Sequence, residues 1–305
     1  LKKVRKKPIL PDYASIITAL LLVMTLPSTA TVTMVVIGGV IAIVFAKEVF
    51  GGLGSNIFNP ALVGRAFLQV AFPAQMTMYP VPERVPFLGV FENIVKNLDI
   101  VVSEATQSIE AVGALTHATP LTFMKFTYAG NLSSSLIEQI KFESHYYLQM
   151  FLGSTGGAIG ETSFLLLLIG GIFLLITKTI NWRIPLGMFI SLFIVSLLLN
   201  LAMPGKFASP IYQVLAGGFC LGAFFMATDM VTCPTSPLGA WIYALLIGLV
   251  LAILRAFGTS PEYTMYSILI GNMFMPLIAM LTRPMPFGKK ESIIMQKSQK
   301  QEGGK

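Results

Sequence analysis

Long apolar runs dominate this sequence and constrain its fold more than any other feature. A helix needs about 20 apolar residues to cross the ~30 Å hydrocarbon layer of a membrane. Charged residues make up only 11% of the chain, whereas soluble domains carry roughly a quarter, so a water-facing surface could not be covered. The sequence therefore predicts an all-α polytopic membrane protein with about 8–10 transmembrane helices. The runs lie at 14–27, 31–50, 60–72, 161–178, 184–203, 208–228, 238–256 and 264–282.

The basic residues predict how the chain crosses the membrane. They gather before residue 8, in the turn 178–183 and in the tail 284–305. Such clusters stay on the cytoplasmic side, which places both termini there and argues against nucleic-acid binding. The polar segment 73–144 carries seven acids and four bases and is expected outside. We therefore expect one membrane domain, 1–305, divided into first spans (1–72), this extracytoplasmic segment, further spans (145–283) and a cytoplasmic tail.

A polar break interrupts the apolar pattern at 51–67. It contains Asn56, Asn59 and Pro60 among several glycines. Bare backbone is not tolerated against lipid, so this break must be buried in protein or line a polar cavity. Pro60 suits the first turn of a new helix. Arg65, one turn later, is an intramembrane cation without a partner in this chain and hence a functional-site candidate, expected to bind a cofactor; alternatively, it pairs with another subunit.

A second break at 226–239 echoes the first, and two breaks in corresponding halves are typical of an internally duplicated fold with a site between the halves. Counting spans places both breaks on the cytoplasmic side, so either one segment is re-entrant or the repeat is not inverted. Asp229 in this break and Glu161 at the start of the earlier apolar run 161–178 are membrane-boundary acids. They could relay Na⁺ or H⁺, or they could cap the helices that follow.

The polar segment contains the loop Thr116-His117-Ala118-Thr119-Pro120-Leu121. Its residues are small or hydroxyl-bearing, and by themselves they equally fit a helix cap ahead of Pro120. The two cysteines, Cys220 and Cys233, are too few for a disulfide framework or for a four-cysteine iron–sulfur site within this chain. A ligand pair shared with a partner protein stays open.

Four motifs in order resemble those of a known family. They are GSNIFNPALVGRAF (54–67), THATPL (116–121), GGAIGETS (156–163) and MATDMVT with TSPLGAW (226–241). Together they resemble the family of the D subunit of the Rnf complex, an ion-translocating ferredoxin:NAD⁺ oxidoreductase, and of the related B subunit of the sodium-pumping NADH:quinone reductase. The resemblance covers nearly the whole chain. It implies a fold similar to that of urea transporters.

The resemblance also implies bound flavin. In that family a flavin transferase attaches FMN through its phosphate to a threonine on an accessible loop of pattern D-x-x-[ST]-x-A-T. Thr116, Ala118 and Thr119 match the last positions, with Thr119 as the acceptor, whereas Gly113 stands where the family has Asp. The break with Asn56 and Asn59 is similar to the stretch that lies near a non-covalent riboflavin in the reductases.

The function that the resemblance implies is that of an electron-transfer subunit coupled to Na⁺ or H⁺ movement in a bacterial cytoplasmic (inner) membrane, with the FMN loop on the extracytoplasmic side. The partners would be an FMN-bearing G subunit, a C subunit, iron–sulfur subunits and the flavin transferase. Two other functions remain open from the residues alone: a small-solute channel or transporter, which broken helices fit equally well, and a redox-inert scaffold.

Overall fold

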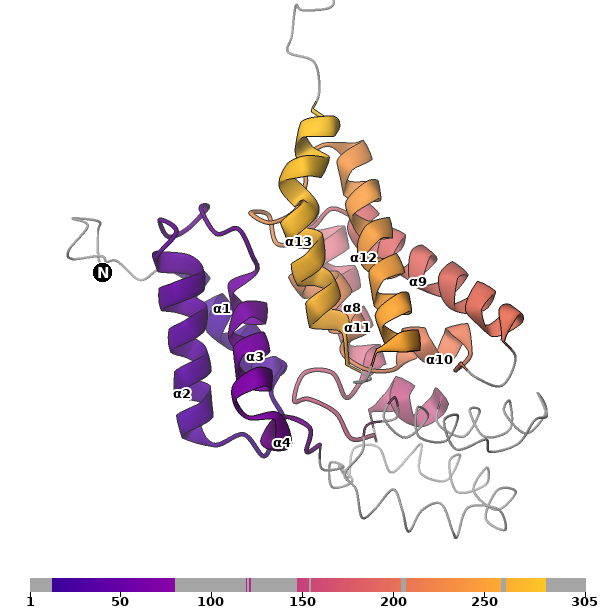
Figure 1. The fold of residues 1–305 in the computed structure, drawn as a ribbon, viewed down its shortest axis with the longest axis horizontal. Helices are drawn as coiled ribbons and strands as arrows, with labels where there is room; N and C mark the ends of the chain where they lie inside the picture. Colours follow the sequence, from indigo (N-terminus) through magenta and orange to yellow (C-terminus); the bar gives the residue numbers. More distant parts are fainter. Residues whose placement is uncertain are drawn as a thin grey trace, which may run out of the picture.

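The computed structural model describes residues 13–79, 119, 121, 147–153, 155–203, 207–258 and 262–283. Within these ranges every regular element is a helix and there is no strand, which confirms the all-α prediction for this part of the chain. The helices form two groups (Figure 1). The first group comes from residues before 80 and the second from residues after 163, and α3 of the first group contacts α13 of the second.

The first group contains α1 (Tyr13–Met24), α2 (Val32–Val40), α3 (Pro60–Ala71) and the short α4 (Pro73–Met76). A π-helical segment, η1 (Ile41–Glu48), continues α2 up to the first break. Glycines allow α2 and α3 to approach closely, because a Cβ on Gly64 would lie 2.7 Å from the carbonyl oxygen of Gly38. Small residues serve the same purpose at many helix contacts within membranes.

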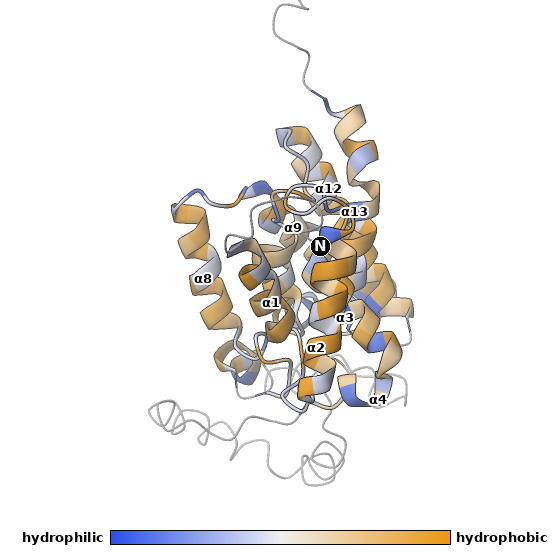
Figure 2. Ribbon diagram, turned by 90° about the vertical axis from the view of Figure 1, so that its left-hand side faces the viewer, coloured by the Kyte–Doolittle hydropathy of each residue, from blue (hydrophilic) through white to orange (hydrophobic). Residues whose placement is uncertain are grey.

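The second group contains α8 (Phe164–Ile176), α9 (Arg183–Ala202), α10 (Pro210–Leu215), α11 (Phe219–Leu221), η3 (Gly222–Met226), α12 (Pro237–Phe257) and α13 (Thr264–Leu281). In the described part, α9, α12 and α13 are long and apolar enough to span a membrane. Their ribbons carry mostly hydrophobic residues (Figure 2). The membrane-protein prediction thus agrees with the structure, while the count of eight to ten spans stays a prediction.

Both polar breaks end as the sequence predicts, in a helix with proline in its first turn. Asn59 caps α3 by accepting hydrogen bonds from the main-chain N–H groups of its second and third residues at 3.1 and 3.4 Å. Ser236 caps α12 by accepting from Gly239 N–H at 3.1 Å. A π-helical segment precedes each break. Both α3 and α12 run from their breaks towards the end of the molecule that holds α4 and α10 (Figure 1). The two breaks therefore lie on the same side of the molecule, away from α4 and α10.

The two breaks also meet directly. The side-chain amide of Asn59 donates a hydrogen bond at 3.0 Å to the carbonyl oxygen of Met226, the last residue of η3. Asn59 is buried, so this bond joins the two helix groups away from solvent. The start of α3 is therefore fixed against the second break.

One predicted span is wrong as a continuous helix. The run 208–228 is divided into α10, α11 and η3, because the chain turns at residues 216–218. Ala216 is extended and Gly217 adopts a φ of 69°, a left-handed conformation that glycine adopts without strain. Two adjacent glycines thus interrupt a run that hydropathy alone predicts to be one helix. The interruption places Gly217 and Gly218 beside the charged residues described next.

Candidate functional site

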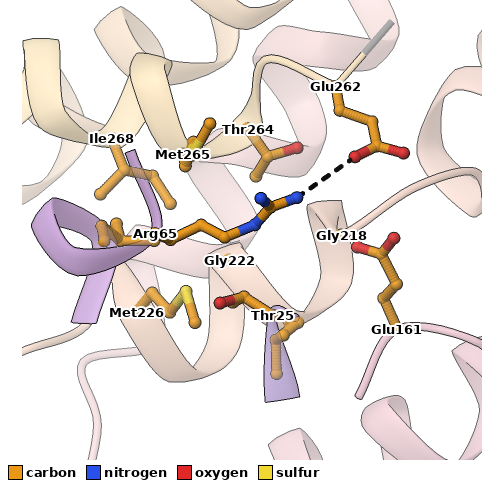
Figure 3. A pocket seen from close by; sticks show the side chains of 12 residues that line it. Thr25, Arg65, Glu161, Gly218, Gly222, Met226, Glu262, Thr264, Met265 and Ile268 are labelled. Atoms are coloured by element: carbon orange, nitrogen blue, oxygen red, sulfur yellow. Dashed lines mark ion pairs between the residues drawn. The ribbon is translucent and has the colours of Figure 1, made fainter. Parts of the chain in front are cut away.

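Arg65 of α3 reaches into a pocket between the two helix groups (Figure 3). Its Nη1 donates to Gln69 Oε1 at 2.9 Å, and its Nη2 donates to Tyr79 Oη at 2.8 Å. The same Nη2 lies 3.8 Å from Oε2 of Glu262, which precedes α13. Tyr79 in turn donates its hydroxyl to that carboxylate oxygen at 2.5 Å. The expectation of an Arg65 without a partner in its own chain is therefore wrong.

A cavity of about 50 Å³ lies beside this ion pair. Arg65 and Glu262 border it on one side and Glu161 borders it on another, with the carboxyl group of Glu161 next to Gly218 (Figure 3). The structure thus brings together Arg65 and Glu161, two residues that the sequence proposed for different roles. The remaining lining is mostly apolar and comes from both helix groups: Thr25, Leu62, Leu221, Gly222, Met226, Thr264, Met265 and Ile268.

Electrostatics favours a proton on Glu161 more than on an ordinary carboxyl group. Burial raises the pKa of Glu161 to about 7, and the nearby carboxylate of Glu262 adds to the rise. The main-chain N–H of Ala158, which donates to Glu161 Oε1 at 2.9 Å, opposes this rise, as do the positive charges of Arg65 and Arg255. Because these groups offset the cost of burying the charge only in part, Glu161 titrates near neutral pH.

Arg255 of α12 supplies a second buried cation. Its Nη1 donates to the carbonyl oxygen of Gln213, and its Nη2 donates to the carbonyl oxygen of Ala216 at 3.1 Å and to Thr264 Oγ1 at 3.4 Å. The Nε of Arg255 is buried without a hydrogen-bond partner among the described residues. Arg255 thus holds the end of α10, where the chain begins its turn, and brings positive charge to the glycines of that turn.

Thr119 is the only residue of the predicted flavin-attachment pattern within the described part, since Thr116 and Ala118 lie outside it. It is 2% exposed, and its hydroxyl donates a hydrogen bond to the carboxylate of Glu262. Thr119 and Glu161 line a second, smaller cavity of about 10 Å³. The enclosed position of Thr119 differs from the accessible loop that the sequence resemblance implies.

The other predicted residues lie apart from this pocket. Asn56 donates its amide to Phe58 O at 3.1 Å, within the first break, and Asn59 makes the cap and the bond between the breaks described above. Asp229 binds within its own turn: its Oδ1 accepts from Val231 N–H at 3.4 Å and its Oδ2 accepts from the Thr232 hydroxyl at 3.3 Å. The helix cap that the sequence analysis left open for Asp229 does not form, because Ser236 caps α12.

Comparison with known proteins establishes the family. Residues 1–288 match the family described as NQR2, RnfD, RnfE. The chain belongs to this family. A relative from Clostridium ljungdahlii, named as the D subunit of a proton-translocating ferredoxin:NAD(+) oxidoreductase complex, is 40% identical over 95% of this chain and 79% of that protein. Two proteins named as D subunits of ion-translocating oxidoreductase complexes, from Alcanivorax borkumensis and Pectobacterium atrosepticum, are each 36% identical, over 93% and 94% of this chain and 78% and 81% of theirs.

The sequence did not lead to three side chains in or around the pocket of this NQR2/RnfD/RnfE-family chain. Arg255 and Glu262 lie near facing ends of two apolar runs, and a charge at a membrane boundary was a sufficient signal to propose both, as it was for Glu161. Tyr79 carries no comparable signal. It joins the site only because the fold brings it to Glu262, 183 positions later in the chain.

Proposed function

We propose that this chain is the D subunit of an ion-translocating ferredoxin:NAD⁺ oxidoreductase complex and that it carries FMN bound covalently to Thr119. Electrons would pass through that flavin between neighbouring redox subunits, coupled to Na⁺ or H⁺ movement. The observation that carries the proposal is the Thr116–Thr119 pattern in a chain whose relatives are named as D subunits of such complexes. FMN would supply the redox chemistry, and the protein would position it and adjust its electrostatic surroundings.

The residues around Thr119 suit this attachment in chemistry but not in space. A threonine hydroxyl is the group to which the FMN phosphate would be attached. Arg65 and Arg255 supply positive charge that favours a phosphate group nearby. The cavity beside Thr119 is about 10 Å³, whereas one water molecule already needs roughly 10–15 Å³. A flavin on Thr119 therefore requires the hydroxyl to leave the position that it has here.

Several further features belong to the same proposal. The chain would lie in a bacterial cytoplasmic membrane with both termini inside and the loop around Thr119 outside. Its fold would be an internally duplicated, urea-transporter-like one, which the similar construction of the two breaks supports. Asn56 and Asn59 would lie near a non-covalent riboflavin, and Glu161 and Asp229 would serve ion movement. The partners would be the G, C and iron–sulfur subunits and the flavin transferase.

The mass of the purified chain tests the flavin directly. We expect protein made together with the flavin transferase to gain the mass of FMN less water and to fluoresce in a denaturing gel. Thr119→Ala should abolish both signals. Thr122→Ala, which changes a threonine outside the pattern, is the matched control and should keep them.

An unmodified Thr119 in the presence of the transferase would contradict the proposal. The same holds if the flavin mass maps to a peptide without Thr119. In either case a scaffold protein, or a channel built from the two broken helices, would become the better explanation of this fold.

A further inference from the structure

The segment before α8 is built to direct the Glu161 side chain inward. A Cβ on Gly218 would lie 2.5 Å from Glu161 Oε2, and a Cβ on Gly157 would lie 3.3 Å from its Cγ. The carboxyl group therefore occupies space that glycine leaves open at position 218, and Gly157 packs closely against the other side of the side chain. Its Oε1 is held by the N–H of Ala158 at 2.9 Å, which leaves Oε2 on the side of Gly218.

The same segment is fixed against the first helix group. Ile159 N–H donates to Leu26 O at 3.0 Å, and Gly160 N–H donates to Met24 O at 2.8 Å, both near the end of α1. A side chain at Gly160 would collide with Met24, since a Cβ there would lie 2.5 Å from that residue's Cβ. The main chain just before Glu161 is thus fixed to the end of α1, while Gly218 of the second group lies against the Glu161 carboxyl group.

Glu161 is also the residue that the two cavities share. It borders the cavity of about 50 Å³ with Arg65 and Glu262, and the cavity of about 10 Å³ with Thr119. The larger volume exceeds the roughly 10–15 Å³ that one water molecule needs. Water in that cavity can therefore reach Glu161 and exchange a proton with it.

The charged and titratable groups that face Glu161 come from every neighbouring segment. They are Glu262 before α13, Arg65 on α3, Arg255 on α12 and Tyr79 after α4. The positive charges of the two guanidinium groups cancel the negative charges of the two carboxyl groups when both carboxyl groups are ionised. Because Glu262 has Tyr79 and Arg65 as direct partners, Glu161 is the carboxyl group that can change its charge with the smaller loss of contacts.

The oxygens of the larger cavity are poorly suited to a metal cation. Its side-chain oxygens are those of the Glu161 and Glu262 carboxyl groups and of the Thr25 and Thr264 hydroxyls, and Glu262 Oε2 and Thr264 Oγ1 already accept hydrogen bonds, from Tyr79 and Arg255. The rest of the side-chain lining is mostly apolar. A hard cation needs several oxygen ligands, and two nearby guanidinium groups would repel it. A proton needs no such ligand shell, because it binds covalently to one oxygen.

We propose that Glu161 is a proton-exchanging group at this junction and that its cavity serves H⁺ and not Na⁺. One proton leaves a hydronium ion of the cavity water and forms an O–H bond on Oε2, so that the neutral cluster gains one positive charge and no electron moves. The proposal rests on the proposed ion-translocating function for its purpose, because it names the ion that this site takes. The burial of Glu161 supports the proposal, because burial raises the pKa of its carboxyl group to about 7.

Infrared spectroscopy of the full chain in lipid nanodiscs tests the proposal. We expect a protonated-carboxyl C=O band that shifts in D₂O and disappears as pH rises through neutrality. Glu161→Gln should remove this band entirely. Glu48→Gln is the control, because Glu48 is a buried carboxyl group on η1 that does not border the cavity. Replacing K⁺ by Na⁺ at constant ionic strength should leave the midpoint unchanged.

Three results would overturn the proposal: no carboxyl band that titrates near neutrality, a band that survives Glu161→Gln, or a band that Na⁺ removes at constant pH. Should Glu161→Gln fail to fold, Gly218→Ala provides a second route, because its new Cβ would crowd Oε2 and should shift the midpoint. The spectra need no flavin. A chain without covalent FMN but with this titration would therefore refute the flavin role alone.

Discussion

The hydrogen bond between the two breaks gives a prediction whose size follows from the structure. Asn59→Ala removes the cap of α3 and the donor to the Met226 carbonyl. Losing an N-cap costs about 1 kcal/mol, and hydrogen bonds between membrane helices average about 0.6 kcal/mol. Met226 O keeps a long contact of 3.4 Å from Asp229 N–H, so it is not left wholly unpaired. We therefore expect a loss of about 1.5–2 kcal/mol in the free energy of unfolding.

Asn59→Ser separates the two contributions. Serine can still cap α3 but cannot reach Met226, so this variant should lose about 0.6 kcal/mol, the contribution of the bond between the groups. Reversible unfolding of the detergent-solubilised chain in SDS measures both variants. Thr31→Ala, which removes the cap of α2, should cost about 1 kcal/mol and calibrates the cap alone. If Asn59→Ala costs no more than Thr31→Ala, the bond to Met226 contributes nothing and the reasoning fails.

Three further predictions use the same unfolding assay. Arg65→Gln should destabilise the chain by about 3 kcal/mol, because it leaves the partly buried Glu262 without its cation. Adding Glu262→Gln should restore much of that loss. An additive double variant would contradict the pairing. Gly248→Ala should lower the free energy of unfolding by about 1–3 kcal/mol, because its Cβ would lie 2.9 Å from a main-chain carbonyl oxygen of α9. Gly39→Ala is the control and should change it little, because a Cβ on Gly39 would meet no atom within 4 Å. Since the pKa of Glu161 is raised from 4.5 to about 7, the folded chain binds more protons than the unfolded chain between these two pH values. The free energy of unfolding should therefore fall as pH rises from 4.5 to about 7. Glu161→Gln should reduce this dependence on pH.

Local signals in the sequence were sufficient to predict where the helices begin. Proline after a capping residue marks the starts of α3 and α12 to within one residue, and the apolar runs at 184–203 and 264–282 match α9 and α13 closely. Each of these features depends on neighbours within one helical turn. The run 208–228 was mispredicted because hydropathy does not register the turn at Gly217.

The composition of the pocket could be predicted only in part, because its contacts are long-range. Arg65 and Glu161 were identified as charges in or beside apolar runs, but nothing in the sequence indicates that they share a cavity. Tyr79 and Glu262 are 183 positions apart, and their hydrogen bond exists only after both helix groups have packed. The burial of Thr119 has the same origin, since its partner Glu262 comes from the far end of the chain.

Two irregular segments of the described chain, at 155–163 and 216–218, lie where the charges of this site meet, and the membrane interior explains why. A regular helix satisfies its own backbone but directs its side chains outward, so a charge on it reaches the interior only at a helix contact. Glu161 instead enters from a glycine-rich segment, and Gly218 makes room for it. Gly218 has a φ of −68°, which any residue can adopt, so its glycine is required for space and not for backbone conformation. Gly218 is therefore as much a part of the site as the four charges.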